Sequence, residues 1–421
     1  MKRIFIHMHY MEMGGAERAL LGLLNALDTT RVQVDLFLNQ HTGDFMPLIP
    51  DKVNLLPEQR GYNAIERPLK TIIGEGQWSI AWARLKARWR HRKYSRTLTQ
   101  EQRANDASIF QYVAEAVVPH LPAINNLPDV PYDLAISFIT PHNIVLNQVK
   151  ARKKIAWIHT DYSTVHVNAE RELPIWGGYD RIVSISPDCT RAFLRTFPSL
   201  APKIMEMENI LSSTLIRQQA EAFDVSQEMP RNGQQGVDSR QKSSDDQSAG
   251  GSTPINLLSV GRFCHAKNYD NVPHITRRIV ERGVDVRWYL IGMGDDSLIR
   301  QRIAETGMQE HVIIMGPRAN PYPYIKACDI YVQPSRYEGK SVTVREAQIL
   351  GKPVIVTAYP TAASQIKHGE DGLIVPLDNE GCAQGIAQAI AQPEQLRQLI
   401  RNVGASDFGN ESEVQKIYSL L

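Results

Sequence analysis

Two glutamates eight positions apart are the first residues whose types and spacing suggest chemistry. Glu338 and Glu346 lie on either side of a predicted loop-to-helix transition near Ser341, and Gly339 lets the backbone turn tightly before it. Backbone amides at a helix N-terminus attract anions. A carboxylate beside them is suited to accept hydrogen bonds from hydroxyl groups, such as those of a sugar or a ribose. Two surface glutamates are common, so this pattern needs support from elsewhere in the chain.

Two cations supply that support. Arg262 and Lys267 directly follow a predicted strand at 255–260. In open α/β sheets, ligands collect at the carboxyl ends of the strands. The forked guanidinium of an arginine and the point charge of a lysine together suit a diphosphate. Both cations could instead pair with surface acids, but their position at a strand end favours a ligand.

The elements that must position these residues form two series of alternating strands and helices. The first series opens with a strand at 3–8, a Gly-containing turn, a helical pattern at 16–27 and a strand at 32–38. Near-continuous apolar strands separated by helices are typical of parallel sheets buried on both faces. The predicted class is therefore α/β, with two Rossmann-like doubly wound domains. Further strands are predicted at 134–138, 155–158, 181–186, 255–260, 286–291, 312–315, 330–332 and 354–356.

These patterns predict an N-terminal domain at 1–206 and a C-terminal domain at 207–400, with a last helix at 401–421 packing back toward the first domain. Two segments fit neither sheet. Residues 225–253 contain only four apolar residues, so we expect a disordered surface insertion, with a regulatory or partner-binding loop as the alternative. The other is a basic insertion at 66–103.

The overall composition excludes several classes of protein. The 421 residues carry a formal charge of +2, with 43% apolar and 22% charged residues, which argues against a fibrous chain, wholesale disorder and a general nucleic-acid binder. No apolar run approaches the ~20 residues of a membrane-spanning helix, and the first residues are too interrupted for a secretory signal. Four scattered cysteines suit a reducing cytosol. We therefore expect a cytoplasmic protein.

Within the basic insertion, residues 84–96 carry seven basic residues and no acidic one. Three tryptophans and Leu85 recur at helical spacing, which places them along one stripe. Such a stripe beside dense cations favours a helix on the cytoplasmic face of an anionic membrane. A helix that packs its tryptophans on its own domain is the equal alternative, and RNA binding is a weaker one. The expected membrane contacts are Trp78, Trp82, Arg84, Arg88, Trp89, Arg90 and Arg92.

In combination, the motifs resemble those of the retaining glycosyltransferases of family 4, which have the GT-B fold of two Rossmann-like domains facing a cleft. The resemblance covers most of the chain outside the two insertions. It rests on the segments Val260-Gly261-Arg262 with Lys267-Asn268, Glu338 with Glu346, Gly351 to Val356, Gly369 to Val375 and Gly14 to Arg18.

The resemblance implies an acceptor-side N-terminal domain, a nucleotide-sugar-binding C-terminal domain and a role for each matched residue. Arg262 and Lys267 would hold the diphosphate of a nucleotide sugar, Glu338 the donor sugar and Glu346 the ribose. His159 falls where the family often keeps a histidine near the transferred sugar, although a lone histidine could equally be structural. The family often has an aromatic residue where Lys340 stands, which leaves the donor sugar open. The remaining donor contacts implied are Gly14, Gly15, Arg318, Gly339, Lys340, Ser341 and Val342.

The expected activity is retaining transfer of a sugar, from a UDP-sugar by preference, to a glycan or a polyprenyl-diphosphate-linked glycan in surface polysaccharide or glycolipid synthesis. Fixed cations would stabilise the leaving diphosphate, so no metal or other cofactor is expected. Two alternatives stay open: a nucleotide-sugar epimerase or hydrolase on the same fold, and a glycan- or nucleotide-binding protein whose transferase site has decayed.

Overall fold

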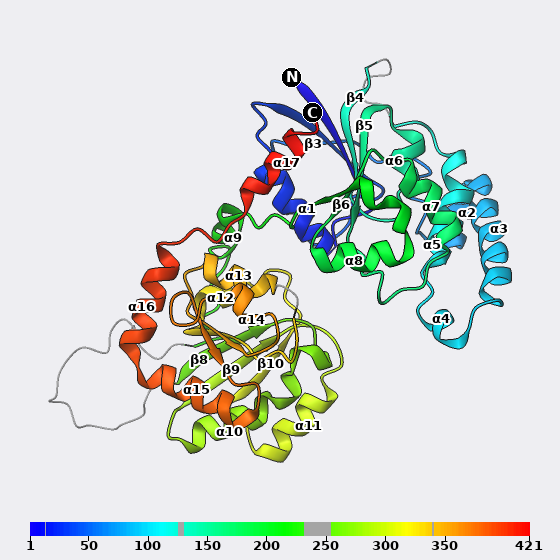
Figure 1. Cartoon of the computed structure of the whole chain (residues 1–421). Helices are drawn as coiled ribbons and strands as arrows, with labels where there is room; N and C mark the ends of the chain where they lie inside the picture. The colour runs from blue at the N-terminus through cyan, green and yellow to red at the C-terminus, as the bar shows by residue number, and fades with distance from the viewer. Residues whose placement is uncertain (13, 125–129, 231–253, 339–340) are drawn as a thin grey trace. The chain divides into compact units, whose positions relative to one another are not determined.

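The computed structural model describes residues 1–12, 14–124, 130–230, 254–338 and 341–421, which form two compact α/β units (Figure 1). The first unit comprises Met1–Ser212 and Asn410–Leu421, and the second comprises Ser213–Gly409. The chain therefore leaves the first unit after Ser212, slightly later than the boundary at 206 that the sequence predicts.

The first unit is built on a parallel sheet of seven strands in the order β3-β2-β1-β4-β5-β6-β7. Its strands are β1 (Lys2–Met8), β2 (Val32–Leu38), β3 (Asn54–Leu55), β4 (Tyr132–Ser137), β5 (Ala151–Ile158), β6 (Arg181–Ser184) and β7 (Ile204–Glu206). Its helices are α1 (Gly15–Ala26), α2 (Leu69–Gly74), α3 (Trp78–Ser95), α4 (Gln100–Ala104), α5 (Ser108–Val117), α6 (Asn143–Gln148), α7 (Ala169–Gly177), α8 (Pro187–Thr196) and α17 (Gln415–Tyr418).

The second unit repeats this plan with six parallel strands in the order β10-β9-β8-β11-β12-β13. Its strands are β8 (Ile255–Val260), β9 (Val286–Ile291), β10 (Val312–Gly316), β11 (Ile330–Gln333), β12 (Val354–Thr357) and β13 (Leu373–Val375). Its helices are α9 (Ser213–Gln219), α10 (Val272–Glu281), α11 (Ser297–Thr306), α12 (Tyr322–Ala327), α13 (Val342–Ile349), α14 (Ala362–Gln365), α15 (Asn379–Ala391) and α16 (Pro393–Gly404).

Each sheet has one point at which the strand order reverses. It lies between β1 and β4 in the first unit and between β8 and β11 in the second. In each sheet the chain first adds strands on one side of β1 or β8, and then adds the remaining strands on the opposite side of that strand. The loops after these paired strands diverge and leave room for a ligand at the carboxyl ends. The predicted α/β class is confirmed, and each unit contains one such candidate position.

Close approach of two loops fixes the carboxyl ends of β8 and β9. A Cβ atom at Gly292 would collide with the carbonyl oxygen of Gly261, so only glycine fits there. Phe263 N–H then donates to the Met293 carbonyl at 2.7 Å. Arg262 therefore stands on a loop whose backbone is held on both sides.

The last residues return to the first unit. The Asp28 N–H donates to the Tyr418 hydroxyl at 2.7 Å, and the Arg31 guanidinium lies 4.0 Å from the centre of the Tyr418 ring. Lys153 Nζ donates to the Leu420 carbonyl at 2.7 Å. The returning segment starts at Asn410, whereas α16 belongs to the second unit.

The basic insertion forms a helix, α3, which is the outermost helix of the first unit in Figure 1. Ile80, Ala83 and Ala87 are buried on the side that packs against α5, whereas Trp78, Trp82 and Trp89 are exposed by 65, 72 and 68%. The alternative in which α3 packs its tryptophans on its own domain is therefore wrong. Among the described residues, no helix combines the length and the apolar character that crossing a bilayer requires.

Arg84 does not belong to the exposed surface of α3. It lies at helical spacing from Ile80 and Ala87, is buried, and donates from Nη1 to the carbonyls of Ala64 (2.8 Å) and Arg67 (2.5 Å). Its predicted membrane contact is wrong because the guanidinium anchors the chain that leads into α2. Arg88, Arg90 and Arg92 are exposed.

The polar insertion predicted to be disordered lies mostly outside the described residues, at 231–253. The residues that lead into it are described, and Val225 and Met229 are buried there. The predicted segment therefore begins with a part that packs on the second unit.

Candidate functional site

The reversal point of the second unit brings together residues that the sequence singled out. The loop after β8 carries Arg262 and Lys267, and the loop after β11 carries Glu338. The two loops are tied together, since Arg336 N–H donates to the Ala266 carbonyl at 2.8 Å and Asn268 Nδ2 donates to the Pro334 carbonyl at 2.9 Å.

Glu338 is the centre of this cluster. Its Oε1 lies 2.5 Å from Lys267 Nζ and also accepts hydrogen bonds from Ser335 Oγ (2.7 Å) and Gln333 Nε2 (3.1 Å). Lys267 is thus paired with an acid, and the acid is the other candidate site residue. The pair is mostly shielded from solvent, with side-chain exposures of 19% for Lys267 and 11% for Glu338. A fixed cation could hold a phosphate group, and a carboxylate beside it could accept a hydrogen bond from a hydroxyl group.

The two predicted arginines differ in their surroundings. Arg262 is exposed and makes no ion pair or side-chain hydrogen bond with the described residues, so its guanidinium is available to an anion. Arg318 instead forms an ion pair with Glu228 Oε2 at 2.6 Å and donates to the Tyr324 hydroxyl at 3.0 Å. A ligand that used Arg318 would have to share it with Glu228.

Glu346 lies on α13 and is fully buried, where its Oε1 accepts a hydrogen bond from the Tyr322 hydroxyl at 2.8 Å. A ribose could reach it only if this neighbourhood rearranged, so the ribose contact stays a prediction. α13 starts after Ser341, as the sequence predicts, and the Ser341 N–H donates to Gln365 Oε1 at 2.9 Å. Val342 is exposed at the first turn. The predicted contacts Gly339 and Lys340 lie outside the described residues.

The predicted glycines of the first unit stand at the start of α1. Gly14 is the N-cap, and a Cβ there would collide with the carboxylate of Glu17. Burial raises the pKa of that carboxyl, and the Glu17 backbone opposes the rise with a hydrogen bond. A Cβ at Gly15 would meet no atom within 4 Å. An approaching phosphate would therefore meet open space at Gly15 and an acid at Gly14.

His159 follows β5 and packs against two rings, with its centroid 4.7 Å from that of Phe138 and 6.2 Å from that of Trp157. Burial lowers its pKa to about 3, so the imidazole is neutral at physiological pH. Its Nε2 has no hydrogen-bond partner among the described residues. His159 also lines a cavity of ≈ 380 Å³ together with Ser186 and Arg191.

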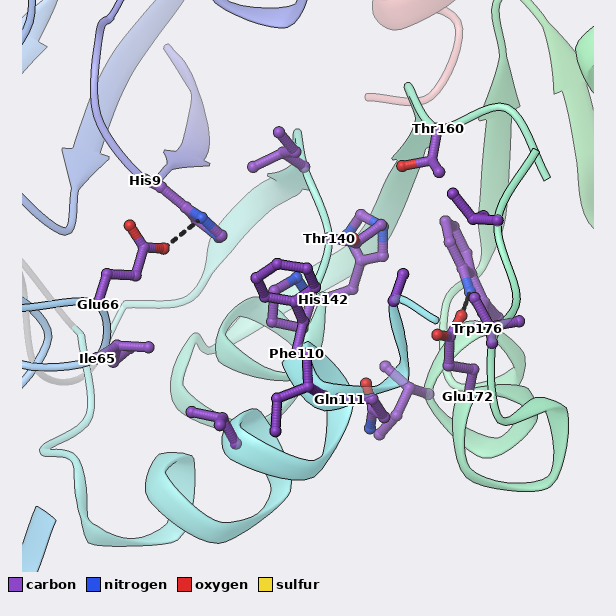
Figure 2. Close-up of a pocket in the computed structure, with 18 of the residues that line it drawn as sticks. His9, Ile65, Glu66, Phe110, Gln111, Thr140, His142, Thr160, Glu172 and Trp176 are labelled. Carbon is purple, nitrogen blue, oxygen red and sulfur yellow. Dashed lines mark hydrogen bonds and ion pairs between the residues drawn. The ribbon is translucent and has the colours of Figure 1, made fainter. Parts of the chain in front are cut away.

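A larger cavity of ≈ 600 Å³ lies at the reversal point of the first unit (Figure 2). His9, directly after β1, and Thr140 and His142, after β4, line it together with Glu66 and residues of α3, α5 and α7. Sequence reasoning missed these residues. The sequence offered one signal for this cavity, the position of His9 directly after a predicted strand. Glu66 gave no such signal, because it is far from His9 in the sequence and approaches it only in the folded chain.

Two doubly wound parallel-sheet units with these loops define the GT-B class of proteins. Among solved structures, the chain is similar to Anabaena Alr3699/HepE in complex with UDP and glucose, with a TM-score of 0.60 at 15% identity, over 100% of this chain and 99% of that one. Residues 241–404 match the family described as "Glycosyl transferases group 1", and this stretch lies within the bounds of the second unit.

Curated relatives match over part of their length. The chain is 28% identical over 150 residues, 35% of this chain and 40% of the relative, to the N-acetylgalactosamine-N,N'-diacetylbacillosaminyl-diphospho-undecaprenol 4-alpha-N-acetylgalactosaminyltransferase of Campylobacter jejuni. It is 28% identical over 137 residues, 32% of this chain and 39% of the relative, to the lipopolysaccharide core biosynthesis glycosyltransferase LpsE of Rhizobium meliloti. The chain thus spans about 40% of the length of these relatives.

Proposed function

We propose that this protein is a retaining glycosyltransferase that moves a sugar from a nucleotide-sugar donor, UDP-linked by preference, to a glycan or lipid-linked glycan in surface polysaccharide or glycolipid synthesis. The observation that carries the proposal is the contact between Lys267 and Glu338 across the reversal point of the second unit. The proposal is supported by the match of residues 241–404 to "Glycosyl transferases group 1". It is also supported by the names of the relatives, which are those of glycosyltransferases.

In the proposed reaction, the bond between the anomeric carbon and the diphosphate oxygen breaks, and its electron pair stays on the diphosphate. Arg262 and Lys267 stabilise that charge, which is why we expect no metal between the phosphates. Glu338 binds a hydroxyl of the donor sugar. The acceptor hydroxyl forms the new bond on the same face of the sugar and gives its proton to the departing phosphate. Glu346 would bind the ribose only after it separates from Tyr322.

Nucleotide binding tests the donor site without knowledge of the acceptor. UDP added at about 100 times its Kd should stabilise the protein by about 2.7 kcal/mol in a thermal-shift titration. Arg262→Ala should remove most of this stabilisation, whereas Arg302→Ala, which changes a partly exposed arginine paired with Glu305, should leave it unchanged. The proposal is wrong if neither UDP nor another nucleoside diphosphate binds. Turnover of UDP-sugars without any acceptor would favour the hydrolase or epimerase alternative.

We propose further that α3 holds the protein on an anionic membrane, where a polyprenyl-diphosphate-linked acceptor would be found. The exposed tryptophans lie on the face opposite the buried one, so they are free to enter a lipid surface. Exposed cations flank the tryptophans on both sides of the helix, as an interfacial helix on anionic lipid requires. These flanking residues are Lys86, Arg88, Arg92 and Lys93.

Vesicle sedimentation tests this second part. Replacing Arg88, Arg90 and Arg92 by Gln should weaken binding to phosphatidylglycerol vesicles about 100-fold, at about 1 kcal/mol for each cation. Replacing Trp78, Trp82 and Trp89 by Ala should also weaken it. The control changes three arginines of the second unit, Arg277, Arg282 and Arg302, to Gln and should bind like the wild type. Equal sedimentation of all four proteins would contradict membrane contact by α3.

A further inference from the structure

Gln333, the last residue of β11, is an unexpected side chain beside the candidate donor site. It is fully buried, although it continues the apolar run of its strand. A buried amide costs free energy unless its donors and its acceptor oxygen find partners, whereas an apolar side chain of similar size has no such requirement. The described residues supply four partners for this amide, and these partners lie in and around the candidate site.

The amide of Gln333 lies between a carboxylate and two hydroxyl groups, which decides its orientation. Its Nε2 donates to Glu338 Oε1 at 3.1 Å and to Ser335 Oγ at 2.8 Å. Its Oε1 accepts from the Tyr331 hydroxyl at 2.9 Å and from Thr343 Oγ1 at 3.3 Å. A carboxylate can only accept hydrogen bonds, so the amide nitrogen must face Glu338, and the two hydroxyls on the other side can donate to the amide oxygen.

Glu338 is therefore held by neutral donors as well as by Lys267. Its Oε1 accepts from the Ser335 hydroxyl at 2.7 Å and from Gln333 at 3.1 Å, and it lies 2.5 Å from the ammonium nitrogen of Lys267. Its Oε2 accepts no hydrogen bond from the described residues. A diphosphate that draws Lys267 away would leave two donors on Oε1, so the carboxylate would keep its direction and Oε2 would stay open to a hydroxyl group.

The oxygen end of the amide joins Glu338 to two other elements of the candidate site. Thr343 lies in the first turn of α13. The Val260 N–H donates to the Tyr331 hydroxyl at 3.4 Å, at the end of β8 and just before the loop that carries the proposed diphosphate cations. Gln333 thus connects the carboxylate proposed to bind the sugar with that loop and with the start of α13.

We propose that Gln333 is a positioning residue of the donor site, which keeps Glu338 directed at the donor sugar while Lys267 is drawn to the diphosphate. This inference rests on the proposed glycosyltransferase function and adds a residue that acts through Glu338 rather than on the substrate. Ser335 assists it, since its hydroxyl accepts from Gln333 and donates to Glu338. Without the amide, the carboxylate would be free to follow Lys267 and would lose its contact with the sugar.

Comparing the binding of UDP-sugars with that of UDP tests the proposal without an acceptor. The probes are UDP, UDP-glucose, UDP-galactose, UDP-N-acetylglucosamine and UDP-N-acetylgalactosamine, titrated singly by calorimetry into the full chain. Gln333→Leu should bind UDP like the wild type, which also shows that the variant is folded. It should bind the UDP-sugar that the wild type prefers about tenfold more weakly, the scale of one lost hydrogen bond to a charged group. The control Gln348→Leu removes another buried glutamine of the second unit, which donates to the Asp371 carbonyl, and should bind both ligands like the wild type.

A double substitution separates positioning from a general structural role. In a Glu338→Ala background, Gln333→Leu should cause no further loss of UDP-sugar affinity, because the group through which Gln333 acts is gone. Thr343→Val removes one of the two hydroxyls that hold the amide, and it should weaken UDP-sugar binding by less than Gln333→Leu does. An equal loss of UDP and UDP-sugar affinity in Gln333→Leu, or a further loss in the Glu338→Ala background, would mean that Gln333 supports the fold only.

The remaining outcomes distinguish this proposal from the proposed function. Unchanged UDP-sugar affinity in Gln333→Leu would overturn the positioning role. A wild type that binds UDP but none of the four UDP-sugars would overturn it too, because Glu338 would then have no sugar to hold. Failure of the wild type to bind any nucleoside diphosphate would instead overturn the proposed function.

Discussion

The ammonium group of Lys267 and the carboxylate of Glu338 lie 2.5 Å apart and join the loops that follow β8 and β11. Ser335 and Gln333 donate to the same carboxylate oxygen, so Glu338 is held before any ligand arrives. A diphosphate that binds Lys267 must therefore share that cation with Glu338. The two residues should consequently respond differently to substitution.

Lys267→Ala should weaken UDP binding and lower sugar transfer at least ~100-fold, because it removes a fixed charge from the proposed diphosphate site. Glu338→Gln should lower transfer but leave UDP binding the same or tighter, since Lys267 is then released from its acid. Calorimetric titration with UDP and a transfer assay measure the two effects. Lys326→Ala, which removes an exposed lysine paired with Glu221, is the control. A loss of UDP affinity in Glu338→Gln would mean that Glu338 contacts the nucleotide.

Arg84→Met should lower the free energy of unfolding by about 2–3 kcal/mol. The change leaves the carbonyls of Ala64 and Arg67 without their charged donor in a buried place. Arg92→Met, on the exposed side of the same helix, should change stability by less than about 0.5 kcal/mol. Urea unfolding measures both variants, and equal stabilities would contradict the anchoring role of Arg84.

Gly292→Ala should destabilise the second unit by at least about 2 kcal/mol, because the new methyl group would collide with the backbone of Gly261. Gly404→Ala is the matched control, since its Cβ would meet no atom within 4 Å. Thermal unfolding distinguishes them. A Gly292→Ala protein as stable as the wild type would mean that the two loops separate easily.

The first unit should lose stability as the solution is acidified. Burial lowers the pKa of His7 and of His159 to about 3 from 6.5, and lowers that of His142 as well. The unfolded chain therefore binds more protons than the folded one below pH 6.5, so this stability is fully present above pH 6.5 and is lost as the pH falls toward 3. Within this window, each histidine contributes about 1.4 kcal/mol per pH unit.

Replacing one of these histidines tests the pH dependence. His159→Phe keeps a ring against Phe138 and Trp157 but cannot take up a proton, so the slope of stability against pH should fall by about 1.4 kcal/mol per unit. Hydrogen exchange of first-unit peptides in urea at several pH values measures the slope. His120→Phe changes an exposed histidine and should leave it unchanged. An unaltered slope in His159→Phe would mean that His159 takes up protons in the folded state.

Most of the fold could be predicted because its strands are continuous apolar runs. β2, β8 and β9 have the predicted bounds, whereas β3, β7 and β13 were not predicted as strands. These three contain only two or three residues, and runs that short show no period. They are strands only because a neighbouring strand supplies their hydrogen bonds.

The candidate site could be predicted where position along the chain determines it. Lys267 and Glu338 meet because each follows a strand end at the same edge of the sheet, and Arg262 stands on the same loop as Lys267. The burial of Glu346 under Tyr322 depends on packing between α12 and α13, which no local spacing reveals. The contact of His9 with Glu66 likewise depends on tertiary packing, because the two residues are far apart in the sequence.

The way the backbone is divided between the units has a practical consequence for protein engineering. The second unit is one uninterrupted stretch, Ser213–Gly409, inserted into the first. It could be excised as a single polypeptide for nucleotide-binding work. The first unit would need a short artificial linker from Ser212 to Asn410, because Tyr418 and Leu420 complete its surface.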